Sequence, residues 1–157
     1  MRLTYFHSLG YPKKRWTDRK IGAKWIKDFH KWMANTCSNE EYWLLLVNGH
    51  VSHYTHRFLQ FTQEHQILVL CYPAHGTHIH QGLDVVVFGP LKNNWTKERD
   101  YWEQETGQKI YKTYFLTVYS HAHLHTLTPE TICATFWKTG VWPFNPDVVT
   151  DVMMVLS

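Results

Sequence analysis

Histidine is the residue type in this sequence most suited to metal chemistry, and twelve histidines occur among 157 residues. Imidazole nitrogens are common ligands of zinc and other transition metals. One group has the spacing His-x-x-His-x-His and raises the hypothesis of a zinc site: His75, His78 and His80. A second group follows a predicted strand and could approach the same region, where we expect at most weak metal binding: His50, His53 and His56.

Two other candidates have simpler structural interpretations. Asp84 lies at the start of a predicted helix, where a lone aspartate more often caps the N-terminus than binds a metal. His121, His123 and His125 alternate near the end of another predicted helix. We therefore do not expect these three histidines to share a face or to form a site.

Basic residues crowd into one N-terminal segment and could face phosphate groups. They are Lys13, Lys14, Arg15, Arg19, Lys20, Lys24 and Lys27. A charge run of this kind is more often a solvated helix face. The net charge of +3 is modest, so it does not decide between these two interpretations.

Length and composition limit the class of protein. A chain of this size with 44% hydrophobic residues can form one domain with a single core, burying roughly 70% of its unfolded surface. Its longest apolar runs, 43–47 and 67–72, are far shorter than the roughly 20 residues that span a bilayer, and no signal peptide is evident. Three widely spaced cysteines suggest neither disulfides nor a zinc motif. We expect a soluble, unexported protein of a reducing compartment, with no membrane partner.

The spacing of apolar residues predicts a strand–helix–strand unit after an N-terminal helix. A helix is expected over 18–34, and short continuous apolar runs predict buried strands at 43–47 and 67–72. The segment 53–64 between them has helical spacing. Such a unit pairs its strands in parallel, and ligands gather beyond the carboxyl ends of the strands, which places Asn48 and the loop 73–81 at that edge.

The second half of the chain predicts mainly helices. Residues 85–88 would be assigned to a strand on propensity alone, but this local pattern misleads. Helices are expected over 91–106, 112–125 and 129–138; the last has Thr128 as its cap and Gly140 just past its end. The apolar tail after Pro146 could form a last helix or strand.

Four blocks of the sequence, 16–26, 45–53, 73–92 and 136–149, resemble a known family in the same order. The closest block contains Pro73, His75, Thr77, His78, Gln81, Leu83, Asp84, Val85, Phe88, Gly89, Pro90, Leu91 and Lys92. In the block 45–53, Asn48 follows an apolar run where the family has an aspartate. Together the blocks resemble DDE superfamily transposases of the pogo group, within the Tc/mariner transposable elements. Relatives of that group include centromere protein B and jerky-like proteins.

The resemblance implies an RNase H-like α/β fold and a two-metal nuclease site. Such a site needs three carboxylates, because two Mg²⁺ ions must activate the nucleophile and stabilise the leaving oxygen of a phosphodiester. By resemblance Asp84 is the third acid and a metal ligand, and Asn48 occupies the position of the second acid. The loop histidines would shape the active-site loop, and nucleic-acid contacts are expected from His78, Lys92, Trp95, Lys13, Lys14 and Arg15.

Several departures from the family pattern suggest that catalysis is lost. The amide of Asn48 cannot bridge or neutralise two cations, so we expect the ancestral Mg²⁺ to bind poorly. The first acid has no candidate, and the first strands of the fold are expected to be missing before Met1. Ala74, His80 and Gly82 replace family residues in the loop, which we expect to be looser as a result.

We therefore predict a DNA-binding, catalytically inactive remnant of a DDE transposase that acts in the nucleus. The expected domain covers 16–149, preceded by an N-terminal remnant at 1–15 and followed by a tail at 150–157. Two alternatives are an active metal-dependent endonuclease, completed by the missing N-terminal part, and a non-catalytic protein-interaction module. For a sheet without its first strands we expect marginal stability, self-association through the exposed sheet edge, or a gene model that begins too late.

Overall fold

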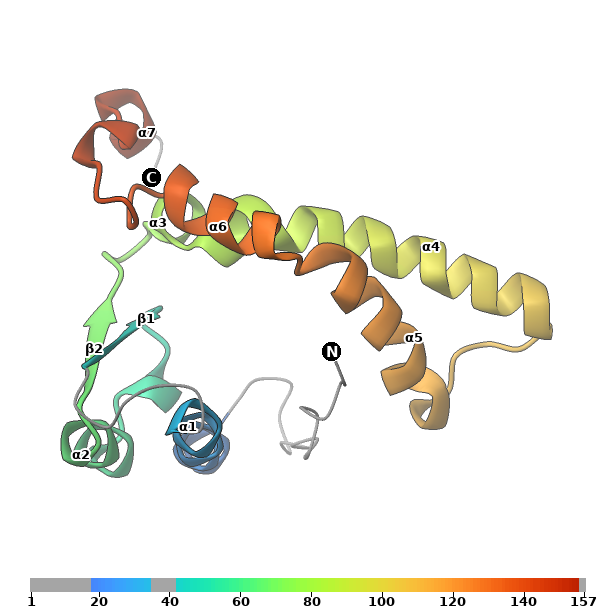
Figure 1. Cartoon of the computed structure of the whole chain (residues 1–157), viewed down its shortest axis with the longest axis horizontal. Coiled ribbons are helices and arrows are strands. Elements are labelled where there is room, and N and C mark those ends of the chain that lie inside the picture. Colours follow the sequence, from blue (N-terminus) through green and yellow to red (C-terminus); the bar gives the residue numbers. More distant parts are fainter. Residues whose placement is uncertain (1–17, 35–41, 156–157) are drawn as a thin grey trace. The chain divides into compact units, whose positions relative to one another are not determined.

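The computed structural model describes residues 18–34 and 42–155, and the chain divides into two compact units, Met1–Ala74 and His75–Ser157 (Figure 1). A two-stranded parallel sheet in the first unit and a series of helices in the second make the fold mixed α/β, compatible with part of an RNase H-like domain. The segment Lys13 to Arg15 lies outside the described residues.

The first unit contains the predicted strand–helix–strand arrangement. Its elements are α1 (Arg19–Ala34), β1 (Trp43–Val47), the 3-10 turn η1 (Val51–His53), α2 (His56–Glu64) and β2 (Ile67–Cys71). Asp18 caps α1, because its Oδ1 accepts hydrogen bonds from the backbone N–H of Lys20 at 2.8 Å and of Ile21 at 2.9 Å. Thr55 caps α2 in the same way. The helix predicted over 53–64 begins only at His56, and His53 belongs to η1.

The two strands pair in parallel, in a register that runs from Trp43 opposite Ile67 to Val47 opposite Cys71. One sheet face packs on the two helices, around a core of Ile26, Phe58 and Ile67. The strands were expected to be buried on both faces, and the structure corrects this. The alternate side chains, which include Leu44, Leu68 and Leu70, are exposed.

A glycine brings α1 close to the turn after β1. At Gly22 a Cβ atom would lie 2.5 Å from the carbonyl oxygen of Ser52, a fully buried residue of η1. Only glycine, which has no Cβ atom, allows α1 to come this close to the backbone of Ser52. The sequence motif around Gly22 therefore supports the turn that follows Asn48.

The second unit is helical. It consists of α3 (Thr77–His80), the π-helical turn η2 (Leu83–Val87), α4 (Phe88–Thr106), α5 (Lys112–Thr126), α6 (Pro129–Lys138), the 3-10 turn η3 (Pro146–Val148) and α7 (Asp151–Val155). The β-branched run at 85–87 is helical despite its strand propensity. Because η2 leads directly into α4, that helix begins at Phe88, earlier than the predicted residue 91.

The helix α5 packs against α4 (Figure 1). Contacts between aromatic side chains hold the two helices together. The ring centroids of Trp95 and Phe115 are 5.4 Å apart, and those of Trp102 and Tyr114 are 5.0 Å apart. The predicted boundaries of the last long helix are confirmed, with Thr128 as its cap and Pro129 in its first turn.

Candidate functional site

Asn48 directly follows β1 at the carboxyl edge of the sheet. The backbone N–H of Tyr72, just past β2, donates to the carbonyl oxygen of Val47 at 3.0 Å, so the chain leaves both strands at the same edge. This is the place at which parallel sheets usually present polar groups to a ligand. The predicted position of Asn48 relative to the strands is therefore confirmed.

The side chain of Asn48 is engaged in a local turn. Its Oδ1 accepts a hydrogen bond from the backbone N–H of His50 at 3.2 Å. The backbone carbonyl oxygen of Asn48 lies 3.3 Å from Nδ1 of His53. An aspartate could accept the same bond from His50, because a carboxylate oxygen is also an acceptor. The turn itself thus gives no reason for an amide at this position.

His50 and His53 take part in the same turn. Nδ1 of His50 lies 2.8 Å from the hydroxyl of Ser52 and accepts from the Ser52 backbone N–H at 3.3 Å, which caps η1. His53 Nδ1 can donate to the carbonyl of Asn48, and the two rings are 6.0 Å apart. These nitrogens are occupied by structural contacts. Across the described ranges, no three His, Cys, Asp or Glu side chains gather as a metal site.

Tyr54 adds a neutral hydroxyl near the end of β2. Burial, together with a hydrogen bond to the Cys71 thiol, raises the pKa of Tyr54 to about 12. The phenol therefore stays protonated at neutral pH and cannot act as a general base there. It can only donate or accept a hydrogen bond.

Asp84 presents a free carboxylate in the second unit. It lies in the first turn of η2, and its backbone N–H donates to the carbonyl of Gln81 at 2.9 Å. The side chain is exposed and makes no hydrogen bond or ion pair with any described residue. The N-cap position belongs to Gly82, so the helix-capping interpretation of Asp84 is wrong. Its negative charge is favoured by the positive end of the helix and is available to a ligand.

The segment before Asp84 is closely packed at Gly82. Gly82 rests against Thr135 of α6, where a Cβ atom would come within 2.7 Å of the Thr135 Cβ. A proline or any other side chain at position 82 would collide with α6. The glycine therefore positions η2 instead of loosening it.

The other predicted contact residues have different surroundings. His78 on α3 and Lys92 on α4 are exposed, as a contact with nucleic acid requires. Trp95 is half-buried, and its ring packs against Phe115 and Tyr119 of α5. The Trp95 ring therefore packs between α4 and α5 and stabilises their contact.

One cluster of a carboxylate with two histidines, on the same helix pair, was not predicted from the sequence. Nδ1 of His121 and Nδ1 of His125 lie 3.4 Å and 3.3 Å from the two carboxylate oxygens of Glu98. The two histidines are one helical turn apart and do share a face, contrary to expectation. Their i, i+4 spacing was the signal that could have shown this.

A comparison with protein families supports the DDE superfamily part of the resemblance. Residues 8–136 match the family model described as DDE superfamily endonuclease. A protein of the fungus Cochliobolus lunatus, named MFS-type transporter clz9, is 31% identical over 140 residues. That match covers 89% of this chain but only 15% of the fungal protein. No solved structure matches significantly. Among the described helices, none is long and apolar enough to cross a membrane.

Proposed function

Because the chain belongs to the DDE superfamily endonucleases, we propose that it is a pogo-like, transposase-derived segment that binds DNA in the nucleus without cutting it. The family membership supports a nucleic-acid-related function. The observation that carries the loss of cutting is Asn48, a neutral amide at the end of β1 where two-metal chemistry uses a carboxylate.

We infer that the side chains at positions 48 and 84 do not by themselves supply the ligands for a pair of divalent cations. Asp84 supplies one free carboxylate, and the Oδ1 atom of Asn48 is already held by the N–H of His50. Magnesium prefers anionic oxygen ligands, and two ions need several of them. We therefore assign no metal-dependent step to this segment. The domain limits 16–149, with the flanking segments 1–15 and 150–157, belong to the same proposal.

The name of the fungal relative does not enter the proposal. This chain spans about 15% of that protein, so a transport activity of the whole protein need not involve the matched part. The membership in the endonuclease family rests instead on residues 8–136. A likeness to centromere protein B and jerky-like proteins is proposed from the four sequence blocks.

A binding and nicking experiment tests this function. Fluorescence anisotropy with a labelled duplex should show binding at about 50 mM salt that weakens steeply as salt increases, because phosphate contacts release counterions. Supercoiled plasmid with Mg²⁺ or Mn²⁺ should remain unnicked. Nicking by the chain that disappears in Asp84→Ala would contradict the inactive assignment, and no DNA binding at low salt would contradict the nucleic-acid function.

A second candidate function is an endonuclease completed by carboxylates from another chain or segment. The exposed, unpaired carboxylate of Asp84 favours it. Adding a segment that carries the missing acids should then produce Mn²⁺-dependent nicking that Asp84→Ala abolishes. Failure of several such segments to restore any nicking would count against completion in trans.

A third candidate is a protein-interaction module that uses the exposed sheet face. Leu44, Leu68 and Leu70 are 54–57% exposed on neighbouring strands. Apolar side chains gathered in this way can mark a contact surface. Sedimentation should show self-association that Leu44→Asn/Leu68→Asn abolishes. A wild-type chain that stays monomeric at high concentration would contradict this role.

A further inference from the structure

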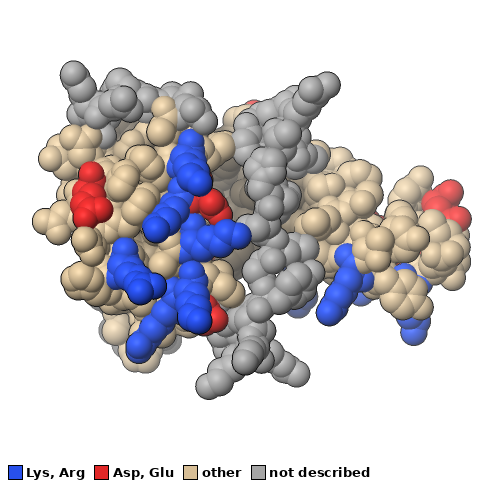
Figure 2. All heavy atoms as spheres, turned by 90° about the horizontal axis from the view of Figure 1, so that it is seen from below, with Lys and Arg blue, Asp and Glu red and all other residues tan. Residues whose placement is uncertain are grey.

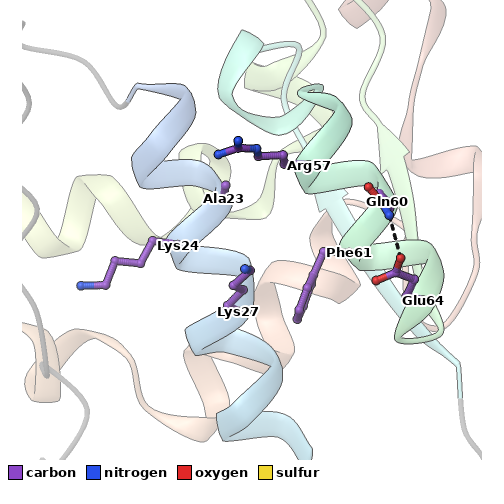
Figure 3. A pocket seen from close by; sticks show the side chains of 7 residues that line it. All are labelled: Ala23, Lys24, Lys27, Arg57, Gln60, Phe61 and Glu64. Carbon is purple, nitrogen blue, oxygen red and sulfur yellow. Dashed lines mark hydrogen bonds between the residues drawn. The ribbon is translucent and has the colours of Figure 1, made fainter.

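A groove with a volume of about 460 Å³ lies between α1 and α2 in the first unit (Figure 3). Lys24 and Lys27 line it from α1, and Arg57 lines it from α2. Figure 3 shows the Arg57 side chain reaching toward Ala23 on α1, whereas Lys24 extends outward from the rim. Positively charged side chains from both helices therefore line the same groove.

The basic residues of α1 repeat along the helix. Lys20, Lys24, Lys27 and Lys31 follow the spacing i, i+4, i+7 and i+11, which places them on one side of α1. Figure 2 shows Lys and Arg side chains gathered over this face of the first unit. Arg57 extends the same stretch of positive charge onto α2, and the sequence run alone did not indicate that it would.

Carboxylates do little to neutralise the groove. None of the described acidic residues forms a salt bridge with Lys24, Lys27 or Arg57. Glu64, the acidic residue in the lining, accepts a hydrogen bond from Nε2 of Gln60 at 2.9 Å. The cations therefore keep charge available for an anionic partner.

The aromatic ring of Phe61 in the groove already contacts two other side chains. Nζ of Lys27 lies 5.8 Å from the centroid of Phe61, within the range of a cation–π contact. The imidazole of His65 stacks on the same ring with centroids 3.9 Å apart. A nucleic-acid base would have to displace one of these partners. The groove therefore suits backbone phosphates better than bases.

We propose that the α1–α2 groove binds the phosphodiester backbone of a nucleic acid and does not read its sequence. This inference rests on the proposed DNA-binding function and names the surface that carries it. A row of cations along a helix can meet successive phosphates of a strand, and such contacts position a duplex without specifying bases. Lys24 and Arg57, called the rim cations below, supply these contacts, and Lys27 lines the groove beside them.

The test compares two double variants by fluorescence anisotropy on short labelled duplexes of unrelated sequence. Lys24→Gln/Arg57→Gln removes two rim cations and leaves the Lys27–Phe61 contact intact. Lys97→Gln/Lys109→Gln removes the same charge from exposed positions of the second unit. Each lost phosphate contact lowers the salt slope of log Kd by about 1, so the rim variant should lose a slope of about 2, and the control variant little. At about 100 mM salt the rim variant should bind at least tenfold more weakly.

The outcomes separate this inference from the proposed function. A wild-type chain that binds no DNA at low salt contradicts both. Wild-type binding with equal slopes for the rim and control variants overturns the groove assignment but keeps DNA binding on another surface. A tenfold preference between duplexes of different sequence overturns the backbone-only reading. Tighter binding to polyglutamate than to DNA overturns the choice of nucleic acid. Unchanged circular dichroism of the rim variant shows that a weaker affinity is not a loss of fold.

Discussion

Gly82 and Thr135 approach so closely that η2 rests on the backbone of α6. A Cβ atom at position 82 would lie 2.7 Å from Cβ of Thr135 and 3.0 Å from its carbonyl oxygen. Thr135 is itself fixed, because it is buried and its hydroxyl donates to the carbonyl of Ile132 at 2.6 Å. The contact therefore sets where the turn that carries Asp84 lies on α6.

Replacing Gly82 by alanine should destabilise the second unit by about 1–3 kcal/mol, the usual cost of overpacking a closed contact. Gly89→Ala is the matched control, because a Cβ atom there meets nothing within 4 Å and alanine favours the helix. Urea unfolding measures both. Equal stability of the two variants would show that η2 can move away from α6 without cost.

Changing Asn48 to aspartate should preserve the turn and increase affinity for divalent cations. The new carboxylate can accept the same hydrogen bond from His50, and it adds the negative charge that Mg²⁺ or Mn²⁺ requires. Isothermal titration with Mn²⁺ measures the gain, with Asn48→Ser as a neutral control. If the aspartate and serine variants bind Mn²⁺ with equal affinity, the side chain at position 48 does not contribute to a metal-binding site.

The amide of Asn48 should also convert slowly to a carboxylate in aged protein. Asn before Gly is prone to deamidation, and the space beside Gly49 is open. Peptide mass analysis of stored samples should find the acid at position 48. A sample that retains only the amide after long storage at mildly alkaline pH would indicate that the bond to the His50 N–H protects the side chain.

The first unit should lose stability as the pH falls through the range in which His30 takes up a proton. Burial, and then the charge of His65, lower the pKa of His30 below the ordinary histidine value of 6.5. The unfolded chain therefore binds a proton that the folded chain resists, so the stability contribution is full above pH 6.5 and decreases below it. Urea unfolding at pH 8 and pH 5 should show a smaller drop for His30→Gln than for the wild type. The exposed His56→Gln serves as the control, and an identical drop in both variants would exclude His30 as the source.

Glu98 should couple weakly to His125 across α4 and α5. The carboxylate is only 18% exposed, but both histidine side chains are mostly solvent-accessible, which limits the energy of each contact. A double-mutant cycle of Glu98→Gln and His125→Gln should give a coupling of about 0.2–1 kcal/mol. A cycle that closes to zero would show that the contact contributes nothing to stability.

Local patterns were enough to predict most of the elements. Apolar spacing and capping residues set α1, α5 and α6 nearly residue by residue, because helix signals are local. The parallel pairing of β1 and β2 followed from the strand–helix–strand order alone. The position of Asn48 at the strand edge followed in turn. The start of α4 was less accurate, since the β-branched residues 85–87 hid the helical turn that precedes it.

The sequence by itself determined the family and the chemical identity of the two key residues, an amide at position 48 and a carboxylate at position 84. It could do so because residue type and order are properties of the chain. Tertiary structure alone decided how these residues are engaged. Oδ1 of Asn48 accepts a hydrogen bond from the backbone N–H of His50, and the carboxylate of Asp84 has no partner among the described residues. Packing between segments far apart in the chain also brings Gly82 close to Thr135. It likewise places Arg57 in the same groove as Lys24 and Lys27. No local pattern encodes such distances, because they follow from how the faces of separate helices fit together.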